Sequence, residues 1–143
     1  MTSARHLLRI KGVGAFAADP SLPVHDALDM MARRNIGSLL IVQNGRLVGL
    51  FTERDFARHV AAVGPSFLDG VVGDVMAVEV PVASPDTPIE ECMALMTDKR
   101  TRHLPVLEND EVVGIVSIGD IVKALIEDKE FVIEQLEKYI SGR

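Results

Sequence analysis

The sequence has little of what marks a metal centre, a disulfide scaffold or a membrane protein. Its single cysteine, Cys92, excludes an intrachain disulfide and the usual clustered zinc sites, and it suits a reducing compartment. No apolar run approaches the ~20 residues that a membrane-spanning helix needs. Residues 1–11 carry basic side chains without a following apolar stretch or cleavage site, so no signal peptide is predicted. We therefore expect a cytoplasmic protein without a membrane partner, in which Cys92 is a buried structural thiol.

The motifs of common enzyme classes are missing as well. The histidines are scattered without metal-ligand spacing: they are His6, His25, His59 and His103. There is no Gly-x-Ser-x-Gly nucleophile elbow, no phosphate loop and no complete Gly-x-Gly-x-x-Gly turn, of which Gly12-Val13-Gly14 is only a fragment. The sequence therefore predicts a protein that is not an enzyme and holds no metal.

Composition sets the broad class. The chain has 143 residues, of which 48% are apolar, and this favours a compact globular fold over disorder. A formal net charge of -6 argues against nucleic acid as the main partner. Any anionic ligand must therefore find a local positive site.

What the sequence does contain is an internal repeat. Moved by 65 positions without a gap, residues 19–55 fall on residues 84–120. The identical pairs are Pro20/Pro85, Pro23/Pro88, Met31/Met96, Leu39/Leu104, Asn44/Asn109, Val48/Val113, Gly49/Gly114 and Asp55/Asp120. A gapless match implies the same order of helix and strand in both copies. Two copies predict pseudo-twofold packing, in which each half covers the apolar surface of the other.

Each copy predicts a helix, a hairpin and a second helix. Apolar residues at helical spacing indicate a helix from Val24 to about Arg34, and Pro88 opens its counterpart through about Lys99. Hairpins follow at 38–52 and 103–117, with turns at 43–45 and 108–110. The hydroxyls of Thr52 and Ser117 are suitable N-caps for the helices that come next.

The remaining segments connect or extend these copies. Short extended pieces at 13–17 and 78–83 lead into the repeats, and residues 67–76 form the connection. Residues 129–140 predict an amphipathic helix that belongs to neither copy and packs on a partner copy or over the module's edge. We predict that the first repeat occupies residues 1–66, the second repeat residues 67–128 and the C-terminal helix the range 129–143. The predicted fold is α/β (α+β), with two units that each contain a small sheet.

These residues resemble a known family. Two copies of helix, hairpin and Gly-apolar-apolar-Thr/Ser-x-x-Asp are similar to a tandem pair of cystathionine-β-synthase (CBS) domains, a Bateman module. The run His103-Leu104-Pro105-Val106 at the second hairpin and the run 73–76 belong to the same resemblance. It implies binding of AMP, ADP, ATP, NAD or, less favoured, S-adenosylmethionine in the cleft between the repeats. It also implies a homodimer and a regulatory, energy-sensing role.

The chemistry of the repeated motif supports a ligand role. A carboxylate at a strand-to-helix junction can accept the hydroxyls of a ribose, and Asp55 and Asp120 stand at such junctions. Thr52 and Ser117 stand where helix N-terminal N–H groups can meet phosphate oxygens. The alternative makes each Asp a first-turn residue favoured by the helix dipole. Gly49 is expected to let backbones approach and to leave room for the ligand, as is its equivalent in the second copy.

The two candidate sites are unequal. Arg102 and His103 lie beside the site of the second copy, where the first copy has Gly37 and Ser38, so phosphate binding is favoured at the site of the second copy. The alternative makes Arg102 a solvated charge at the edge of the strand and His103 a packed edge residue.

Arg54 either points into the cleft shared by the two repeats or lies on the surface. The extended segments at 15–17 and 80–82 are expected to supply the apolar walls for adenine. The candidate ligand-binding residues are Gly37, Ser38, Thr52, Arg54, Asp55, Val80, Pro81, Arg102, His103, Pro105, Ser117 and Asp120.

The predicted function is a sensor that binds an adenosine-containing small molecule and reports occupancy through its shape or its dimer surface. The first alternative is a structural dimerisation or scaffold protein whose pockets are vestigial. The second is an enzyme that uses a nucleotide, for which the sequence supplies neither base nor metal. The regulated protein partner cannot be read from the sequence.

Overall fold

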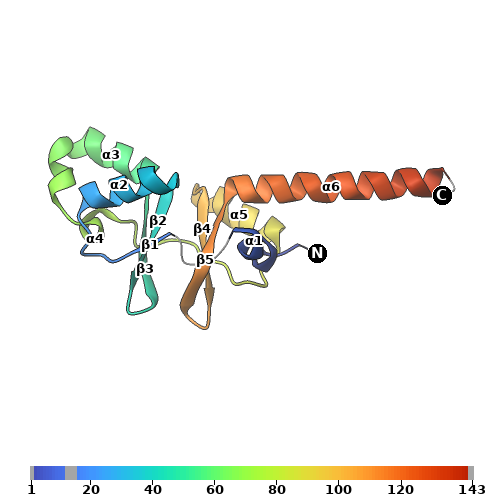
Figure 1. Ribbon diagram of the computed structural model, residues 1–143, viewed down its shortest axis with the longest axis horizontal. Helices are drawn as coiled ribbons and strands as arrows, with labels where there is room; N and C mark the ends of the chain where they lie inside the picture. The colour runs from blue at the N-terminus through green and yellow to red at the C-terminus, as the bar shows by residue number, and fades with distance from the viewer. Residues whose placement is uncertain (1, 12–15, 142–143) are drawn as a thin grey trace.

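The computed structural model describes residues 2–11 and 16–141, and its helices and strands occur in two similar sets (Figure 1). The first set and the connection contain β1 (Ala17–Ala18), α2 (Val24–Arg34), β2 (Ser38–Gln43), β3 (Arg46–Thr52), α3 (Glu53–Val63), η1 (Pro65–Asp69) and α4 (Val72–Val75). The second contains α5 (Ile89–Lys99), β4 (His103–Glu108), β5 (Glu111–Ser117) and α6 (Ile118–Ile140). A further helix, α1 (Ala4–Lys11), precedes both sets. The mixed helix and sheet class agrees with the predicted one.

The backbone repeats itself at the predicted spacing of 65 residues. Left-handed residues end both first helices, Asn35 at φ 53° and Arg100 at φ 53°. Each hairpin has a register shift at the same place, between residues 41 and 42 and between residues 106 and 107. The predicted helices and hairpins are therefore confirmed, because the apolar positions that define them coincide in both copies.

Each hairpin is joined by a short parallel pairing with the segment that leads into its repeat, a two-residue strand in the first copy and a single bridge in the second. β1 pairs with β2, so that Ala18 lies opposite Ile41. Ala83, which is 65 residues after Ala18, forms a parallel bridge with Val106 in the second copy. The predicted extended segments are thus confirmed at their last residues, Ala17 and Ala83. Residues 13–15 of the first segment lie outside the described residues.

Buried side chains form a core in each half and a third cluster between the halves. The first core surrounds Phe51, which is 0% exposed, and the second includes Cys92, also 0% exposed. Between the hairpins, Leu40 and Leu50 of the first copy pack with Ile115 of the second. Through this shared cluster each half covers apolar surface of the other, as predicted.

The two glycines of the repeat make room for apolar side chains rather than for a ligand. A Cβ on Gly49 would overlap the side chain of Met76 and lie 2.9 Å from the carbonyl oxygen of Ala77. A Cβ on Gly114 would overlap a methyl group of Leu8. Close approach of the backbone at Gly49 was predicted correctly, but the space beside these glycines is filled by the protein itself.

This difference predicts unequal costs for the two Gly→Ala substitutions. Ala77 exchanges two backbone hydrogen bonds of 2.9 Å with Leu50, so it cannot move away from a new methyl group at position 49. Gly49→Ala should therefore lower the free energy of unfolding by about 1–3 kcal/mol. Gly114→Ala should cost less, because the end of the Leu8 side chain can rotate. Urea denaturation of both variants measures this, and an equal or larger loss at Gly114 would contradict it.

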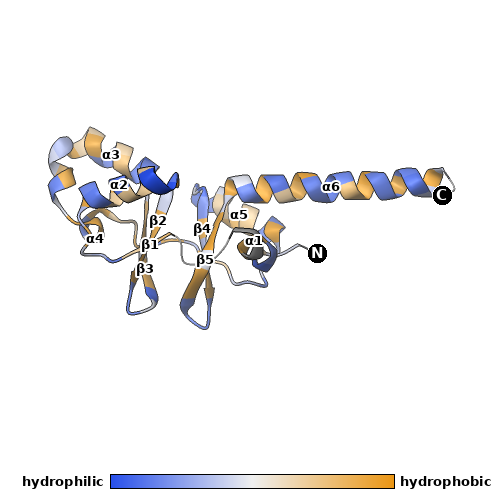
Figure 2. Ribbon diagram, in the orientation of Figure 1, coloured by the Kyte–Doolittle hydropathy of each residue, from blue (hydrophilic) through white to orange (hydrophobic). Residues whose placement is uncertain are grey.

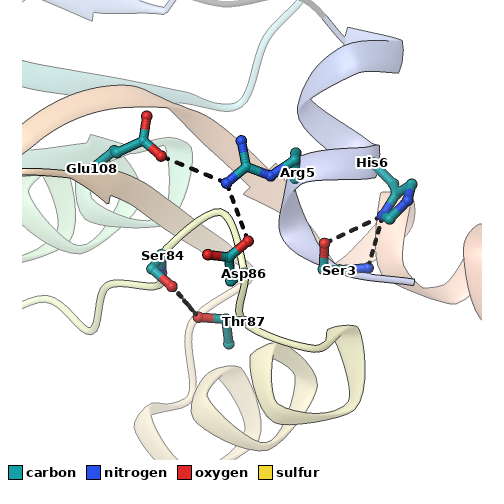
Figure 3. Close-up of polar contacts among 7 residues, drawn as sticks. All are labelled: Ser3, Arg5, His6, Ser84, Asp86, Thr87 and Glu108. Atoms are coloured by element: carbon teal, nitrogen blue, oxygen red, sulfur yellow. Dashed lines mark hydrogen bonds and ion pairs between the residues drawn. The ribbon is translucent and has the colours of Figure 1, made fainter. Parts of the chain in front are cut away.

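The N-terminal helix α1 was not predicted, and it packs on the second half of the molecule. Leu7 and Leu8 are buried in the second core. Arg5 donates to Asp86 at 3.1 Å and lies 3.6 Å from Glu108, as Figure 3 shows. The range 1–66 proposed for the first repeat thus contains a helix that completes the core of the second.

The C-terminal amphipathic helix is not a separate element. Residues 129–140 continue α6 without a break from its cap at Ser117, so the helix is 23 residues long. Its second half extends away from the rest of the molecule and ends near the C-terminus (Figure 1). No residue after Ala124 in this helix is buried. The prediction that this segment covers the edge of the same chain is therefore wrong, because the helix projects away from that edge.

Candidate functional site

A cavity of about 620 Å³ lies where the two halves meet. Eight of the twelve candidate residues line it: Gly37, Thr52, Arg54, Asp55, Val80, Pro81, Arg102 and His103. They come from the start of β2, the junction of β3 and α3, the lead into the second copy and the start of β4. Segments far apart in the sequence therefore share one cavity because the hairpins pack side by side.

The junction of β3 and α3 is fixed by a capping box. Thr52 Oγ1 accepts from the Asp55 backbone N–H at 3.1 Å, and Asp55 Oδ2 accepts from the Thr52 backbone N–H at 3.0 Å. The Thr52 hydroxyl and Asp55 Oδ2 are also 3.0 Å apart. These bonds satisfy N–H groups that the first turn of a helix leaves open. Asp55 thus has the structural role of a first-turn residue, which was the alternative interpretation, and its carboxylate also lines the cavity.

The second half contributes the opposite wall. His103 Cε1 would be 3.7 Å from a Cβ at Gly37, so the starts of β4 and β2 face each other. Arg54 donates through Nη1 to the carbonyl oxygen of Arg100 at 3.2 Å, which links α3 to the loop before β4. Arg54 thus reaches across to the other repeat, in line with the first of its two interpretations.

The pairing of basic residues with carboxylates differs from the sequence prediction. Arg102 and His103 were placed beside the site of the second copy, because they belong to the same repeat as Ser117 and Asp120. The structure puts them in the cavity that Asp55 lines. The reason is the pseudo-twofold packing, which sets the first strand of one hairpin against the helix start of the other repeat.

Positive charge dominates the cavity lining. Five basic residues line it: Arg54, Arg58, Lys99, Arg100 and Arg102. Three acidic residues line it: Glu53, Asp55 and Glu79. The chain as a whole has a net charge of -6, so this cavity is a local exception. It is suited to an anion, because several guanidinium groups can reach one ligand.

Sequence reasoning missed several of these residues. Arg58 lies four residues after Arg54, which places both on one face of α3, so helical spacing was an available signal. Lys99 and Arg100 end α5 and turn into the loop before β4. Their role depends on the packing of the two halves, which leaves no local signal.

Four candidate residues do not line this cavity. Ser38 is 3% exposed and pairs with Thr52 in the hairpin, and Pro105 is a buried residue of β4 paired with Ile115. Ser117 and Asp120 form the equivalent capping box at the start of α6, where each backbone N–H donates to the other's side-chain oxygen at 3.2 Å. A ligand role for these four residues stays a prediction.

Other candidate chemistry finds no support in the described parts of the chain. Residues 2–11 and 16–141 contain no group of three or more His, Cys, Asp or Glu side chains arranged to hold a metal ion. Burial raises the pKa of the Cys92 thiol to about 11, so this cysteine is a poor nucleophile at neutral pH. In the same residues no helix has both the length and the apolar character needed to cross a bilayer.

Comparison with known proteins identifies the family. The CBS domain family matches this chain twice, at residues 13–62 and 72–127. The chain belongs to the CBS domain family. Its two repeats are the two CBS domains of a tandem pair, as the sequence resemblance predicted.

This CBS pair has relatives among curated sequences and among solved structures. The mitochondrial CBS domain-containing protein CBSX3 of Arabidopsis thaliana is 38% identical over 124 residues, which are 83% of this chain. The chain spans 60% of the length of that relative. The crystal structure of the CBS domain NE2398 has a TM-score of 0.81 at 42% identity, and the match covers 87% of this chain and 98% of that one.

Two further structures contain ligands. The CBS domain pair of MJ0100, 25% identical with a TM-score of 0.79, was solved with 5′-methylthioadenosine and S-adenosyl-L-methionine, and the match covers 90% of this chain and 98% of that one. CBSX2 was solved with AMP, and its match covers 90% of this chain and 99% of that one with a TM-score of 0.73. At 23% identity the CBSX2 match shows the fold alone.

Proposed function

We propose that this CBS pair is a regulatory module that binds an adenine nucleotide in the cavity between its repeats. The observation that carries the proposal is the cavity itself, which joins the Thr52-x-x-Asp55 cap of one repeat to the basic residues before β4 of the other. A ligand there contacts both halves at once. Its binding shifts any equilibrium between arrangements of the halves by its difference in affinity for them.

The ribose is assigned to Asp55. The capping box uses Oδ2 of this carboxylate, so Oδ1 is the oxygen that accepts a ribose hydroxyl. Hydrogen bonds to an ionised acceptor are stronger than neutral ones. The capping box also holds the carboxylate in a fixed position before the ligand arrives, which lowers the entropy lost on binding.

The other two parts of the nucleotide follow from the cavity lining. Val80 and Pro81 lie in the cavity with Leu50 and Ala77, and these residues supply an apolar wall for adenine. The excess of basic over acidic residues favours a phosphate group at the opposite wall. This favours AMP, ADP, ATP or NAD over S-adenosylmethionine, whose sulfonium is a cation. The MJ0100 complex supports an adenosine-containing ligand for the family and leaves this choice to the lining residues.

Isothermal titration tests the proposal. The purified chain, freed of co-purified nucleotide, is titrated separately with AMP, ADP, ATP, NAD, S-adenosylmethionine and adenosine. We expect saturable binding of one phosphate-bearing ligand that is weaker for adenosine. No heat with any of the ligands would reject the nucleotide module and favour the scaffold alternative. Release of product from a bound nucleotide would instead indicate an enzyme.

Arg102 should distinguish a nucleotide from its nucleoside. If its guanidinium contacts a phosphate, Arg102→Ala should weaken AMP binding by about 1.5–3 kcal/mol and leave adenosine binding nearly unchanged. Arg46→Ala, at an exposed arginine in β3 that does not line the cavity, is the matched control. Equal losses for AMP and adenosine in the Arg102 variant would refute the phosphate contact.

The place of this module in the cell is a further part of the proposal. If another protein responds to nucleotide bound in the cavity, the chain acts as a sensor of the cell's energy state. The predicted compartment for this role is the cytoplasm. The relative CBSX3 is named as mitochondrial. Fractionation of cells expressing the native protein tests the cytoplasmic prediction.

A further inference from the structure

Among the described residues that line the cavity, His103 is the one whose side chain ordinarily changes charge near neutral pH. The other ionisable residues of the lining are arginine, lysine, aspartate and glutamate, which ordinarily titrate outside the range of about pH 6–8. Protonation of His103 therefore raises the excess of basic over acidic side chains in the cavity by one. The charge that an anionic ligand meets thus depends on the state of this imidazole.

The imidazole of His103 lies where the two repeats meet. His103 begins β4 and is half-buried. A Cβ at Gly37, in the first repeat, would lie 3.7 Å from His103 Cε1 and 3.6 Å from Glu53 Oε1. An imidazole of one repeat and a carboxylate of the other therefore border the same narrow space. The Glu53 backbone N–H donates to the Gly37 carbonyl oxygen at 3.1 Å, which fixes the start of α3 against the residue before β2.

Hydrogen bonds hold the backbone around His103. The Thr101 hydroxyl donates to the His103 carbonyl oxygen at 3.1 Å and accepts from the His103 backbone N–H at 3.4 Å. The Ile118 N–H donates to the Arg102 carbonyl oxygen at 2.8 Å. Figure 2 shows the chain just before β4 as hydrophilic, beside the largely hydrophobic β5. The imidazole is thus presented from a fixed strand end, which lowers the entropy lost when a ligand binds.

Charged groups of both signs face His103. Across the cavity they are Glu53, Arg54, Asp55 and Arg58 of α3 and Glu79 of the segment before the second repeat; on its own side they are Lys99, Arg100 and Arg102, and Asp120 belongs to the capping box that begins at its strand partner Ser117. A nearby opposite charge favours the charged form of an ionisable group, and a like charge disfavours it. A phosphate that enters this cavity adds negative charge and so favours the imidazolium.

We propose that nucleotide binding in the cavity is linked to protonation of His103, whose imidazolium contacts the phosphate. The inference rests on the proposed function, because a phosphate-bearing nucleotide is the anion proposed for this cavity. Coupling between two binding events is reciprocal. If phosphate favours the protonated imidazole, protonation strengthens nucleotide binding by the same factor, and affinity rises as the pH falls. The module then reports a nucleotide and acidity together.

The pH dependence of binding tests the linkage. AMP and ATP are titrated calorimetrically into the wild type and into His103→Asn, which keeps an N–H donor but cannot take up the charge. Protonation of the nucleotide's own phosphate, with a pKa of about 6, is common to both proteins and cancels in the comparison. For the nucleotide that binds, the ratio of wild-type to variant affinity should rise about 10-fold from pH 8 to pH 6, since one proton changes an equilibrium by at most about 10-fold per pH unit.

His25→Asn is the matched control. The His25 side chain is 76% exposed on α2 and does not line the cavity, so this variant should follow the wild type at every pH. Adenosine is the matched ligand, because it lacks the phosphate. Its affinity ratio between the wild type and His103→Asn should not change with pH. A change as large for adenosine as for the nucleotide would overturn the phosphate contact.

Proton NMR of the wild type tests the linkage without a variant. The imidazole Cε1 proton of His103 is assigned through the backbone of the isotope-labelled chain, and its shift reports the charge of the ring. At pH 7, saturating AMP or ATP should move this signal towards the imidazolium position, whereas adenosine should not. A signal that does not move with the nucleotide that binds would overturn the proposal even if His103→Asn fails to fold.

The outcomes separate this inference from the proposed function. Failure of the wild type to bind any of the nucleotides between pH 6 and about pH 8 would reject the nucleotide module, and the proton linkage with it. Nucleotide binding with the same pH dependence in the wild type and in His103→Asn would reject the linkage alone. His103 would then be the packed edge residue of the alternative interpretation.

Discussion

Replacing Asp55 with Asn is expected to weaken nucleotide binding by about 1.5–3 kcal/mol, which is roughly 10- to 150-fold in the dissociation constant. The substitution removes the charge that strengthens the hydrogen bonds to ribose. It keeps an oxygen that can still accept from the Thr52 backbone N–H, which Asp55 Oδ2 now accepts at 3.0 Å. Asn is therefore preferable to Ala, whose loss of the capping box would cost about 0.5–2 kcal/mol of helix stability.

Asp120→Asn is the matched control for this prediction. Asp120 occupies the equivalent capping box at the start of α6 but does not line the cavity. Titration calorimetry with the same ligand should give wild-type affinity at the cavity for the Asp120 variant. If instead Asp55→Asn binds normally and Asp120→Asn does not, the working site is the one at the start of α6, and the assignment of the ribose to Asp55 fails.

Phe51→Ala is expected to have the largest effect on stability. Phe51 is fully buried in the first core, where it lies opposite Leu39 in the hairpin. Removing a buried aromatic ring loses its transfer free energy and leaves a cavity, at a cost of about 3–5 kcal/mol. Because small domains are stable by only about 5–15 kcal/mol, this variant should be close to unfolding at 37 °C.

The control for the core prediction is Phe131→Ala. Phe131 is 61% exposed on α6, so its removal should change the free energy of unfolding by no more than about 0.5 kcal/mol. Thermal and urea denaturation followed by circular dichroism measure both variants. A loss at Phe51 no greater than that at Phe131 would show that the first core is not packed as described.

The repeated elements could be predicted from sequence because their signals are local. Val24 and Ile89 begin helices whose apolar spacing defines their buried faces, and the hairpins are marked by alternation and turn residues. Thr52 and Ser117 are confirmed as N-caps, since a hydroxyl before a helix with Asp three residues later has a specific local geometry.

Features that depend on packing could not be predicted. Helix α1 is short, and its place in the second core rests on Leu7 and Leu8 meeting a hairpin roughly a hundred residues away. That Arg102 and Asp55 line one cavity rests on how the two halves are arranged. A sequence repeat shows that two units exist, but the register between them is a tertiary property.

Only part of the site could be predicted, for the same reason. The Thr52-x-x-Asp55 motif is local, and its equivalent at residues 117–120 made it recognisable. Arg58, Lys99 and Arg100 became site residues only when α3 and the end of α5 were brought to one cavity. Only Arg58 had a local signal, since it lies four residues after Arg54 in α3; Lys99 and Arg100 had none.

The most direct test of the central claim is an NMR titration of the isotope-labelled chain with AMP. If the nucleotide binds in the cavity between the repeats, the amide signals of residues 52–58 and 99–103 should shift together and saturate at one ligand per site. Those segments are 41 or more positions apart in sequence and meet at this cavity. Shifts confined to one repeat, or no shifts at saturating AMP, ADP, ATP or NAD, would contradict it.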